Sequence, residues 1–217
     1  MQLGKHNAGL SLLEVMVATA LLGAISGAII LATDSTSKSM RTGSVLAEMD
    51  MVGSRVLDRI GEELAVAQRI DVLPASPAAE APFHTSQLDF QATTYIGAVV
   101  GLDDAARIGF EYQPGEADDG VDNNTNGLTD EGVVVFTEDV GLVNARRNVL
   151  CRWVREALEG EVLGNGVDDN GNGLRDEGGL CFDFDGDRVT IRLTLERADP
   201  QGLLLTRTFE RTIALRR

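Results

Sequence analysis

Two stretches of the sequence carry oxygen-bearing residues at the spacing of a metal-binding loop. Residues 120–132 read GVDNNTNGLTDEG, residues 166–178 read GVDDNGNGLRDEG, and the two align without a gap. Counted from the first aspartate, both have an oxygen-bearing side chain at positions 1, 3, 5, 9 and 10, with glycine at position 6 and leucine at position 7. The candidate ligands, which include the backbone carbonyls of the two leucines, are Asp122, Asn124, Asn126, Leu128, Asp130 and Glu131 in the first stretch and Asp168, Asn170, Asn172, Leu174, Asp176 and Glu177 in the second.

The ligand chemistry of both stretches favours calcium. Hard cations such as Ca²⁺ take about six to eight oxygen ligands, and glycine at position 6 permits the sharp turn of such a loop. Neither stretch contains cysteine or histidine, which argues against soft metals. Position 12 holds Val133 or Gly179 where an EF-hand has a bidentate glutamate. The stretches therefore resemble the short calcium loops of dockerin-like and thrombospondin-like repeats, and a motif repeated in bacterial surface proteins. The alternative is that Asp, Asn and Gly form ordinary turns.

A long apolar segment near the N-terminus contains a single charged residue. From Leu10 to Ala32 nearly every residue is apolar or small, and the one charge in this run is Glu14. At about 1.5 Å per residue the run forms a helix of roughly 35 Å, which is enough to cross a hydrocarbon core of about 30 Å. A carboxylate in such a helix costs roughly 2–3 kcal/mol or more unless it finds a partner, so we expect Glu14 to be functional.

The residues around the start of this segment resemble a known signal. Gly9 precedes the apolar run, whereas an ordinary secretory signal is cut after a core of about 7–15 residues. Gly9 followed by LSLLEVMVA resembles the class III signal of type IV prepilins and pseudopilins, although the family more often has Phe in place of Leu10. The resemblance implies that a prepilin peptidase cuts between Gly9 and Leu10 and methylates the new N-terminus. It also implies that Glu14 pairs with the N-terminus of a neighbouring subunit during filament assembly. The alternative is an uncleaved membrane anchor in which the glutamate occurs by chance.

The rest of the sequence predicts an α+β fold in which a long N-terminal helix packs on an antiparallel sheet, as in pilins. We predict a leader at 1–9, a transmembrane and filament-core helix at 10–33, an amphipathic helix at 34–70 and a β-rich domain at 71–217. Apolar residues at three- and four-residue steps indicate that the second helix ends near Gln68, and its glycines allow a bend near residues 34–43. Residues 71–82 are predicted as a loop, and strands are predicted at 87–93, 107–112, 132–137, 148–155, 180–184, 188–196 and 203–215.

Two insertions interrupt this β-rich domain, and they contain the candidate calcium stretches. We call residues 119–132 loop 1 and residues 165–178 loop 2. The final two strands form a hairpin around Asp199 and Pro200, which resembles the end of the larger minor pilins and pseudopilins of the J and W types.

Cys151 and Cys181 flank loop 2 and follow the membrane segment, so we predict a disulfide worth roughly 3–4 kcal/mol in the chain-entropy model. The alternative is two buried free thiols on adjacent strands.

Composition narrows the functional classes. The 217 residues carry 34 acidic and 19 basic side chains, a formal charge of −15, which disfavours nucleic acid as a partner. No nucleotide-binding or catalytic motif is present, so we do not expect an enzyme.

The family resemblance implies a structural subunit of a type IV pilus or of a type II secretion pseudopilus. Its partners would be other pilins, the prepilin peptidase, the assembly platform and, before assembly, the lipid bilayer. It would be a single-pass protein of the bacterial inner membrane with its C-terminal domain in the periplasm. The alternative is a membrane-anchored calcium-binding adhesion module that does not polymerise.

Overall fold

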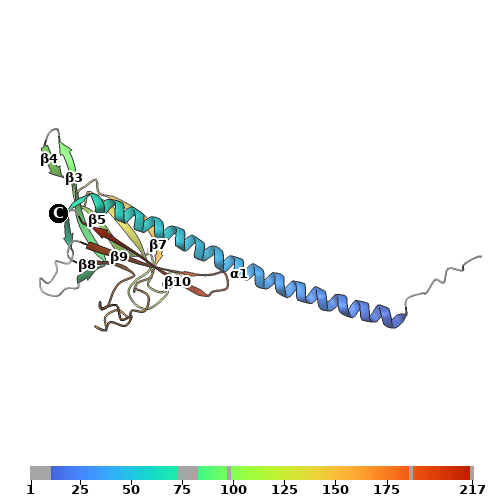
Figure 1. Ribbon diagram of the computed structural model, residues 1–217. Coiled ribbons are helices and arrows are strands. Elements are labelled where there is room, and N and C mark those ends of the chain that lie inside the picture. Colours follow the sequence, from blue (N-terminus) through green and yellow to red (C-terminus); the bar gives the residue numbers. More distant parts are fainter. Residues whose placement is uncertain (1–10, 73–82, 97–98, 186–187, 216–217) are drawn as a thin grey trace, which may run out of the picture. The chain divides into compact units, whose positions relative to one another are not determined.

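A computed structural model describes residues 11–72, 83–96, 99–185 and 188–215 (Figure 1). The predicted cleavage residues Gly9 and Leu10, and residues 73–82 of the predicted loop, lie outside the described residues. The chain forms two structural units, one up to Ser44 and one from Val45 onward. Helix α1 (Leu12–Val66) contributes to both units, and the strands belong to the second. An α+β composition with a long N-terminal helix and an antiparallel sheet is therefore confirmed.

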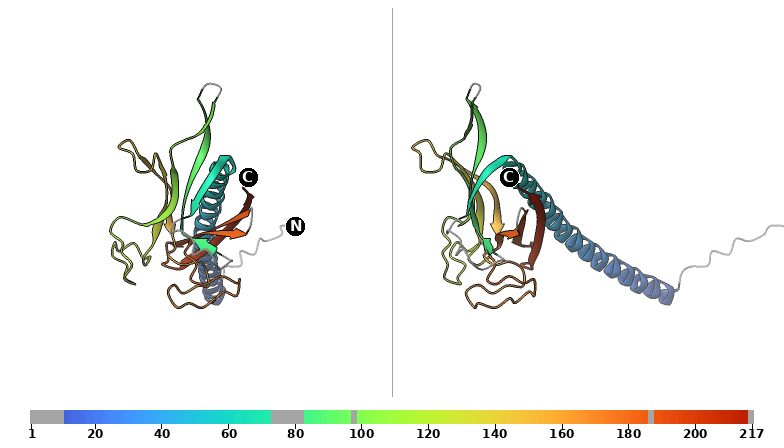
Figure 2. Two further views of the ribbon diagram at one scale, coloured as in Figure 1. Left: turned by 90° about the vertical axis from the view of Figure 1, so that its left-hand side faces the viewer. Right: turned by 60° about the vertical axis from the view of Figure 1, so that its left-hand side comes forward.

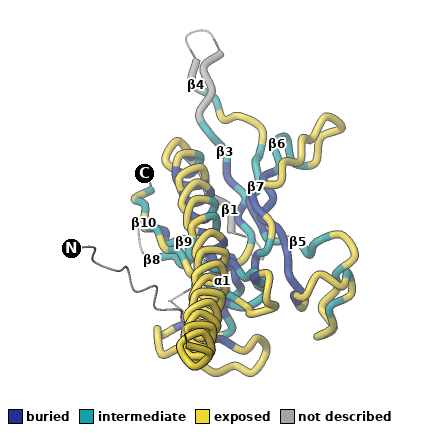
Figure 3. The backbone as a smooth tube through the Cα atoms, turned by 90° about the vertical axis from the view of Figure 1, so that its right-hand side faces the viewer, coloured by how far each residue is buried: buried dark blue, intermediate teal, exposed yellow. Residues whose placement is uncertain are grey.

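In the first unit, helix α1 is apolar and uncovered. Every residue from Ser11 to Arg41 is exposed, as the yellow stretch of the tube in Figure 3 shows. This part of the helix is long and apolar enough to cross a membrane. The helix continues without a break through residues 34–43, where its glycines allow a bend.

A capping box closes the N-terminal end of helix α1. The backbone N–H of Glu14 donates to the Ser11 hydroxyl at 3.2 Å, and the backbone N–H of Ser11 donates to the Glu14 carboxylate at 2.8 Å. This reciprocal pair satisfies two backbone donors that the first turn of a helix otherwise leaves without partners. Glu14 therefore has a local structural role in addition to any role of its charge.

The second unit contains a ten-stranded antiparallel sheet in two groups. One group has the order β1-β3-β5-β6-β7, with β4 added to β3, and the other consists of β2, β8, β9 and β10. The two groups join where Val154 pairs with Leu195, and Figure 2 shows them from two sides. The strands are β1 (Ala67–Val72), β2 (Phe83–Thr85), β3 (Gln87–Ile96), β4 (Val99–Leu102), β5 (Ala106–Tyr112), β6 (Gly132–Glu138), β7 (Arg146–Val154), β8 (Leu180–Asp185), β9 (Arg188–Ala198) and β10 (Leu204–Ala214).

All seven predicted strands are present, with ends that differ by a few residues. Strand β9 alternates as predicted, because Val189, Ile191, Leu193 and Leu195 are all buried. Strand β10 pairs with β9 along its whole length, from Leu204 opposite Ala198 onward, which confirms the final hairpin. Strands β1, β2 and β4 were not predicted. Strand β1 begins at Ala67, so helix α1 ends slightly before the predicted residue, and β1 includes the first two residues of the predicted loop.

One core joins helix α1 to both groups of strands. Fully burying each large aliphatic side chain stabilises the domain by roughly 1.5–3 kcal/mol. The helix face predicted from the three- and four-residue spacing is the buried face, and it consists of Val45, Met49, Gly53, Val56, Leu57, Ile60, Gly61 and Leu64. From the sheet, the core includes Leu88, Ile108, Val134, Val154, Phe182, Ile191 and Leu193.

Glycines on this helix face allow strand β10 to approach closely. The ring of Phe209 lies against Gly53, where a Cβ atom would overlap it, and the Arg211 guanidinium lies against Gly61. Ion pairs join the same surfaces, since Arg197 binds Glu48 at 2.6 Å and Arg211 binds Asp58. At Gly53, therefore, the packing of β10 leaves no room for a side chain, and at Gly61 an added Cβ would lie 3.0 Å from the Arg211 side chain.

The predicted disulfide is wrong, because Cys151 and Cys181 are both free thiols. Both strands run antiparallel to β9 and pair with different parts of it: Val154 of β7 pairs with Leu195, whereas β8 pairs from Leu180 opposite Leu193 to Asp185 opposite Arg188. Cys151 lies three residues before Val154, which is about 10 Å of extended chain, and Cys181 pairs with Arg192, on the opposite side of the Val154–Leu195 pair. A disulfide requires Cα atoms within about 7 Å.

We expect both thiols to be unreactive while the protein is folded. Cys151 and Cys181 are buried, and burial raises the pKa of each thiol to about 12. Because only the thiolate is nucleophilic, on the order of one thiol in ten thousand would be reactive at pH 8. Titration with Ellman's reagent should detect two thiols in denaturant and almost none before unfolding. No thiols in denaturant would mean that a disulfide forms after all.

Candidate metal centres in two acidic loops

Loop 1 connects β5 to β6, and loop 2 connects β7 to β8. Apart from Gly132, which begins β6, neither loop contains helix or strand, and each buries one apolar side chain, Leu128 or Leu174. The glycine at position 6 has a positive φ in both loops, +89° at Gly127 and +94° at Gly173. This conformation favours glycine, as the spacing predicted. The two loops therefore share backbone geometry as well as sequence.

The aspartates at positions 1 and 9 bind the backbone of their own loop. In loop 1, the Asp122 carboxylate accepts from the N–H groups of Asn126 at 3.1 Å and Gly127 at 2.8 Å. The Asp130 carboxylate accepts from the N–H of Gly120 at 2.8 Å. These hydrogen bonds hold the turns of the loop in place.

Loop 2 repeats this arrangement. Asp168 accepts from the backbone N–H groups of Gly171, Asn172 and Gly173, at 2.6–3.1 Å. Asp176 accepts from the backbone N–H groups of Asn165 and Gly166, at 3.0–3.1 Å. The hydrogen bonds between these aspartates and the loop backbone therefore explain why both stretches have aspartate at positions 1 and 9, whether or not a cation is bound.

The glutamate at position 10 lies deeper and draws in the asparagines. Glu131 is 1% exposed, and its Oε1 accepts from the side-chain amides of Asn124 at 2.8 Å and Asn126 at 2.5 Å. Glu177 is 0% exposed, and its Oε1 accepts from the Asn172 amide at 2.7 Å. The other carboxylate oxygen of each glutamate is buried without a hydrogen-bond partner among the described residues. Positions 5 and 10 are thus hydrogen-bonded in both loops, and the position 3 side chain joins them in loop 1.

A second glutamate reaches each loop from the preceding turn, and the sequence analysis missed both. Glu116 Oε1 accepts from the backbone N–H of Asn124 at 2.7 Å, and Glu161 Oε1 accepts from that of Asn170 at 2.9 Å. Both glutamates therefore bind the residue at position 3. They lie outside the aligned repeat, and their distances from the first aspartate differ by one residue, so a gap-free comparison cannot find them.

The interior of loop 2 is rich in negative charge. Glu161 is 3% exposed, and its second carboxylate oxygen also has no hydrogen-bond partner among the described residues. Burial raises the pKa of Glu177; the hydrogen bond from Asn172 opposes this shift, and the charge of Glu161 adds to it. An unpaired buried carboxylate is costly, so a cation beside these two glutamates would stabilise the folded loop.

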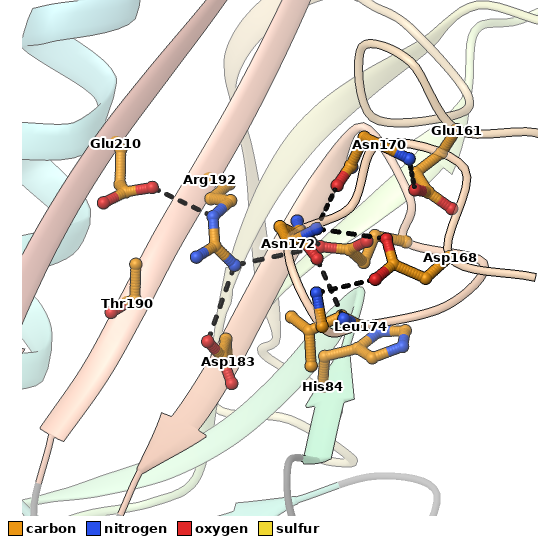
Figure 4. A network of polar contacts seen from close by, with 12 residues as sticks. His84, Glu161, Asp168, Asn170, Asn172, Leu174, Asp183, Thr190, Arg192 and Glu210 are labelled. Atoms are coloured by element: carbon orange, nitrogen blue, oxygen red, sulfur yellow. Dashed lines mark hydrogen bonds and ion pairs between the residues drawn. The ribbon is translucent and has the colours of Figure 1, made fainter.

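One arginine links loop 2 to the final hairpin (Figure 4). Arg192 of β9 lies 3.8 Å from Glu177, 3.5 Å from Asp183 and 3.0 Å from Glu210 of β10. His84 of β2 approaches from the other side and hydrogen-bonds the carbonyl of Arg175 at 2.8 Å. Since Arg192 is shared among three carboxylates and its distance to Glu177 is long, it neutralises only part of the charge inside loop 2.

A separate acidic cluster lies beside loop 1. Carboxylate oxygens of Asp118, Asp130 and Glu156 lie within 4.8 Å of one another. The Tyr112 hydroxyl donates to Glu156 at 2.7 Å, and burial together with the neighbouring acids raises the pKa of Glu156. Asp118 and Glu156 of this cluster line a cavity of about 370 Å³ that Asp176 of loop 2 also lines. Of the cluster, only Asp130 was among the predicted ligands, because Asp118 and Glu156 lie outside the motif.

The oxygen atoms that both loops offer as ligands suit a hard cation. The groups that meet inside them are carboxylates and amides, and oxygen-only sites suit Ca²⁺ and Mg²⁺ better than soft metals. Glu131, Glu161 and Glu177 each present a buried carboxylate oxygen to which no described residue donates a hydrogen bond. No protein-family model, no curated protein and no solved structure matches the chain.

Proposed function

We propose that the protein is a non-enzymatic structural subunit of a type IV pilus or of a type II secretion pseudopilus. The observation that carries the proposal is the part of helix α1 from Leu12 to Ala32, which is apolar, exposed and interrupted by one charge, Glu14. Large exposed apolar side chains recur along it, including Leu12, Leu13, Met16, Leu21, Leu22, Ile25, Ile29, Ile30 and Leu31. Such a surface requires a lipid bilayer or the helices of neighbouring subunits around it.

The position of Glu14 supports the same proposal. It lies in the first turn of the helix, close to the N-terminus that cleavage after Gly9 would create. A positive α-amino group on one subunit and a carboxylate on the next would neutralise each other in an apolar filament core, where an unpaired charge is costly. The prepilin peptidase, other pilins and the inner-membrane assembly platform are the expected partners, and the second unit would lie in the periplasm.

Calcium binding in loops 1 and 2 forms part of the proposed function. An exported domain meets higher calcium concentrations than a cytosolic one, and extracellular calcium modules bind with Kd values of about 10⁻⁴–10⁻³ M. Calcium would bind the folded domain and thereby stabilise it against unfolding. The converging glutamates and asparagines, with their buried unpaired oxygens, support this assignment.

Processing after Gly9 tests the filament-subunit proposal. We expect co-expression of the full chain with a prepilin peptidase to yield a protein that begins with N-methylated Leu10, detected by mass spectrometry. Gly9→Val should block the cut, because the family's peptidase requires a small residue there, whereas Ala8→Val should serve as the matched control and be processed. An intact N-terminus in the wild-type chain would instead favour a membrane-anchored adhesion module that does not polymerise.

A further inference from the structure

We propose that Glu116 and Glu161, which lie outside the repeated motif, are cation ligands in loops 1 and 2. In this assignment they act together with Glu131 and Glu177, while the aspartates at positions 1 and 9 hold the loop backbone. The inference rests on the proposed function, since it names the ligands of the calcium ions suggested there. It also changes the predicted ligand set, in which Asp122, Asp130, Asp168 and Asp176 bind the metal directly.

Burial separates the two kinds of carboxylate. In loop 2, Glu161 and Glu177 are at most 3% exposed, and each has an oxygen buried without a hydrogen-bond partner among the described residues. Both oxygens of Asp168, by contrast, already accept backbone N–H groups. A cation therefore gains most by binding the glutamates, whose oxygens otherwise lose their hydration without any replacement.

The glutamates converge through neighbouring asparagines. Glu161 binds the backbone of Asn170, Glu177 binds the side chain of Asn172, and the Asn172 N–H donates to the Asn170 side chain at 3.0 Å. Figure 4 shows Glu161, Asn170 and Asn172 on facing sides of the loop interior. The same short network thus brings together two carboxylates from different segments of the chain.

Loop 1 offers a related set that is less buried. Glu116 is half-buried, and its two oxygens accept the backbone N–H groups of Asn124 at 2.7 Å and Asn123 at 3.4 Å. Glu116 binds the backbone of Asn124, whose side chain binds Glu131. The carbonyl oxygen of the Asn124 side chain is also buried without a partner among the described residues. Each loop therefore presents two carboxylates, and together they match the charge of one divalent cation.

Calorimetric titration of the full-length protein in detergent with CaCl₂ tests the proposal. The wild type should bind two calcium ions. Glu161→Gln should lose one site or weaken it at least tenfold. Glu159→Gln should keep both sites, because Glu159 is an exposed neighbour that accepts a hydrogen bond from the Thr208 hydroxyl and takes no part in the loop network. Glu116→Gln should remove the other site. Because Glu161 is buried, circular dichroism should confirm that its variant folds; if it does not, Glu116→Gln decides the proposal.

The possible outcomes separate this inference from the proposed function. Two calcium ions bound by Glu161→Gln and Glu116→Gln with wild-type affinity would overturn the ligand assignment and leave calcium binding intact. Absence of calcium binding in the wild type would overturn both the inference and the calcium part of the proposed function. Correct processing after Gly9 does not depend on either result, so the filament-subunit proposal is tested separately.

Discussion

Removal of calcium is expected to lower the melting temperature of the full-length protein by roughly 5–10 °C for each loop that binds it. At a hundredfold excess over Kd, a ligand that binds only the folded state stabilises it by about 2.7 kcal/mol. In a domain of about 150–250 residues, 1 kcal/mol corresponds to roughly 2–4 °C. Loop 2 should contribute the larger share, because Glu161 and Glu177 are both buried and repel each other without a cation.

Thermal unfolding in detergent, followed by circular dichroism with millimolar calcium or with chelator, measures this effect. Magnesium serves as the control and should replace calcium poorly, because it requires a smaller octahedral site. Asp122→Ala and Asp168→Ala should each remove part of the calcium-dependent shift, since each loses backbone hydrogen bonds that shape its loop. The losses should be roughly additive if the loops are independent. A melting temperature that does not change with calcium would identify both loops as ordinary acidic turns.

Loss of the Glu14 charge is expected to reduce incorporation into filaments at least tenfold while leaving membrane insertion intact. Breaking a buried ion pair by removing one partner costs roughly 3–5 kcal/mol, and each 1.4 kcal/mol is about a factor of ten in an equilibrium constant. Insertion should not suffer, because removing a charge from an apolar helix makes the helix more compatible with the bilayer.

The capping box provides matched variants for this experiment. Glu14→Gln keeps an acceptor for the Ser11 N–H and removes only the charge, whereas Ser11→Ala removes the hydroxyl half of the box and keeps the charge. Immunoblots of sheared filaments and of membranes should therefore show a strong defect for Glu14→Gln and Glu14→Ala and a weak one for Ser11→Ala. Assembly of Glu14→Gln at the wild-type level would show that charge pairing is not the role of this residue.

Local patterns in the sequence predicted much of the fold. The spacing from Val45 to Leu64 identified the buried helix face, and strict alternation identified β9. Strand β1 was missed because it follows the helix directly with no turn residue between Val66 and Ala67. Strands β2 and β4 are only three and four residues long, so they are too short for alternation to be recognised.

The candidate site was predictable only where it lies within the repeat. The motif gave the two loops and the buried glutamates at position 10, but Glu116 and Glu161 reach the loops from turns that share no fixed spacing with them. The disulfide failed for a related reason. Two cysteines that flank one loop look like partners in sequence, whereas the pairing of β7 and β8 at different points of β9 carries them apart. Both errors come from tertiary geometry that sequence separation does not encode.

The contact between helix α1 and strand β10 has a consequence for the order of folding. Glu48 and Arg197 are 149 residues apart in the chain, and Asp58 and Arg211 are 153 apart. The helix is synthesised early, whereas β10, the strand that covers Gly53, lies near the end of the described chain and is synthesised late. Contacts between residues so far apart in the sequence slow folding, because the chain loses the entropy of loop closure before these contacts can form and stabilise it. The part of the helix face around Gly53 therefore stays uncovered by β10 until nearly all of the described chain has been synthesised, although strands made earlier can already cover other parts of the face.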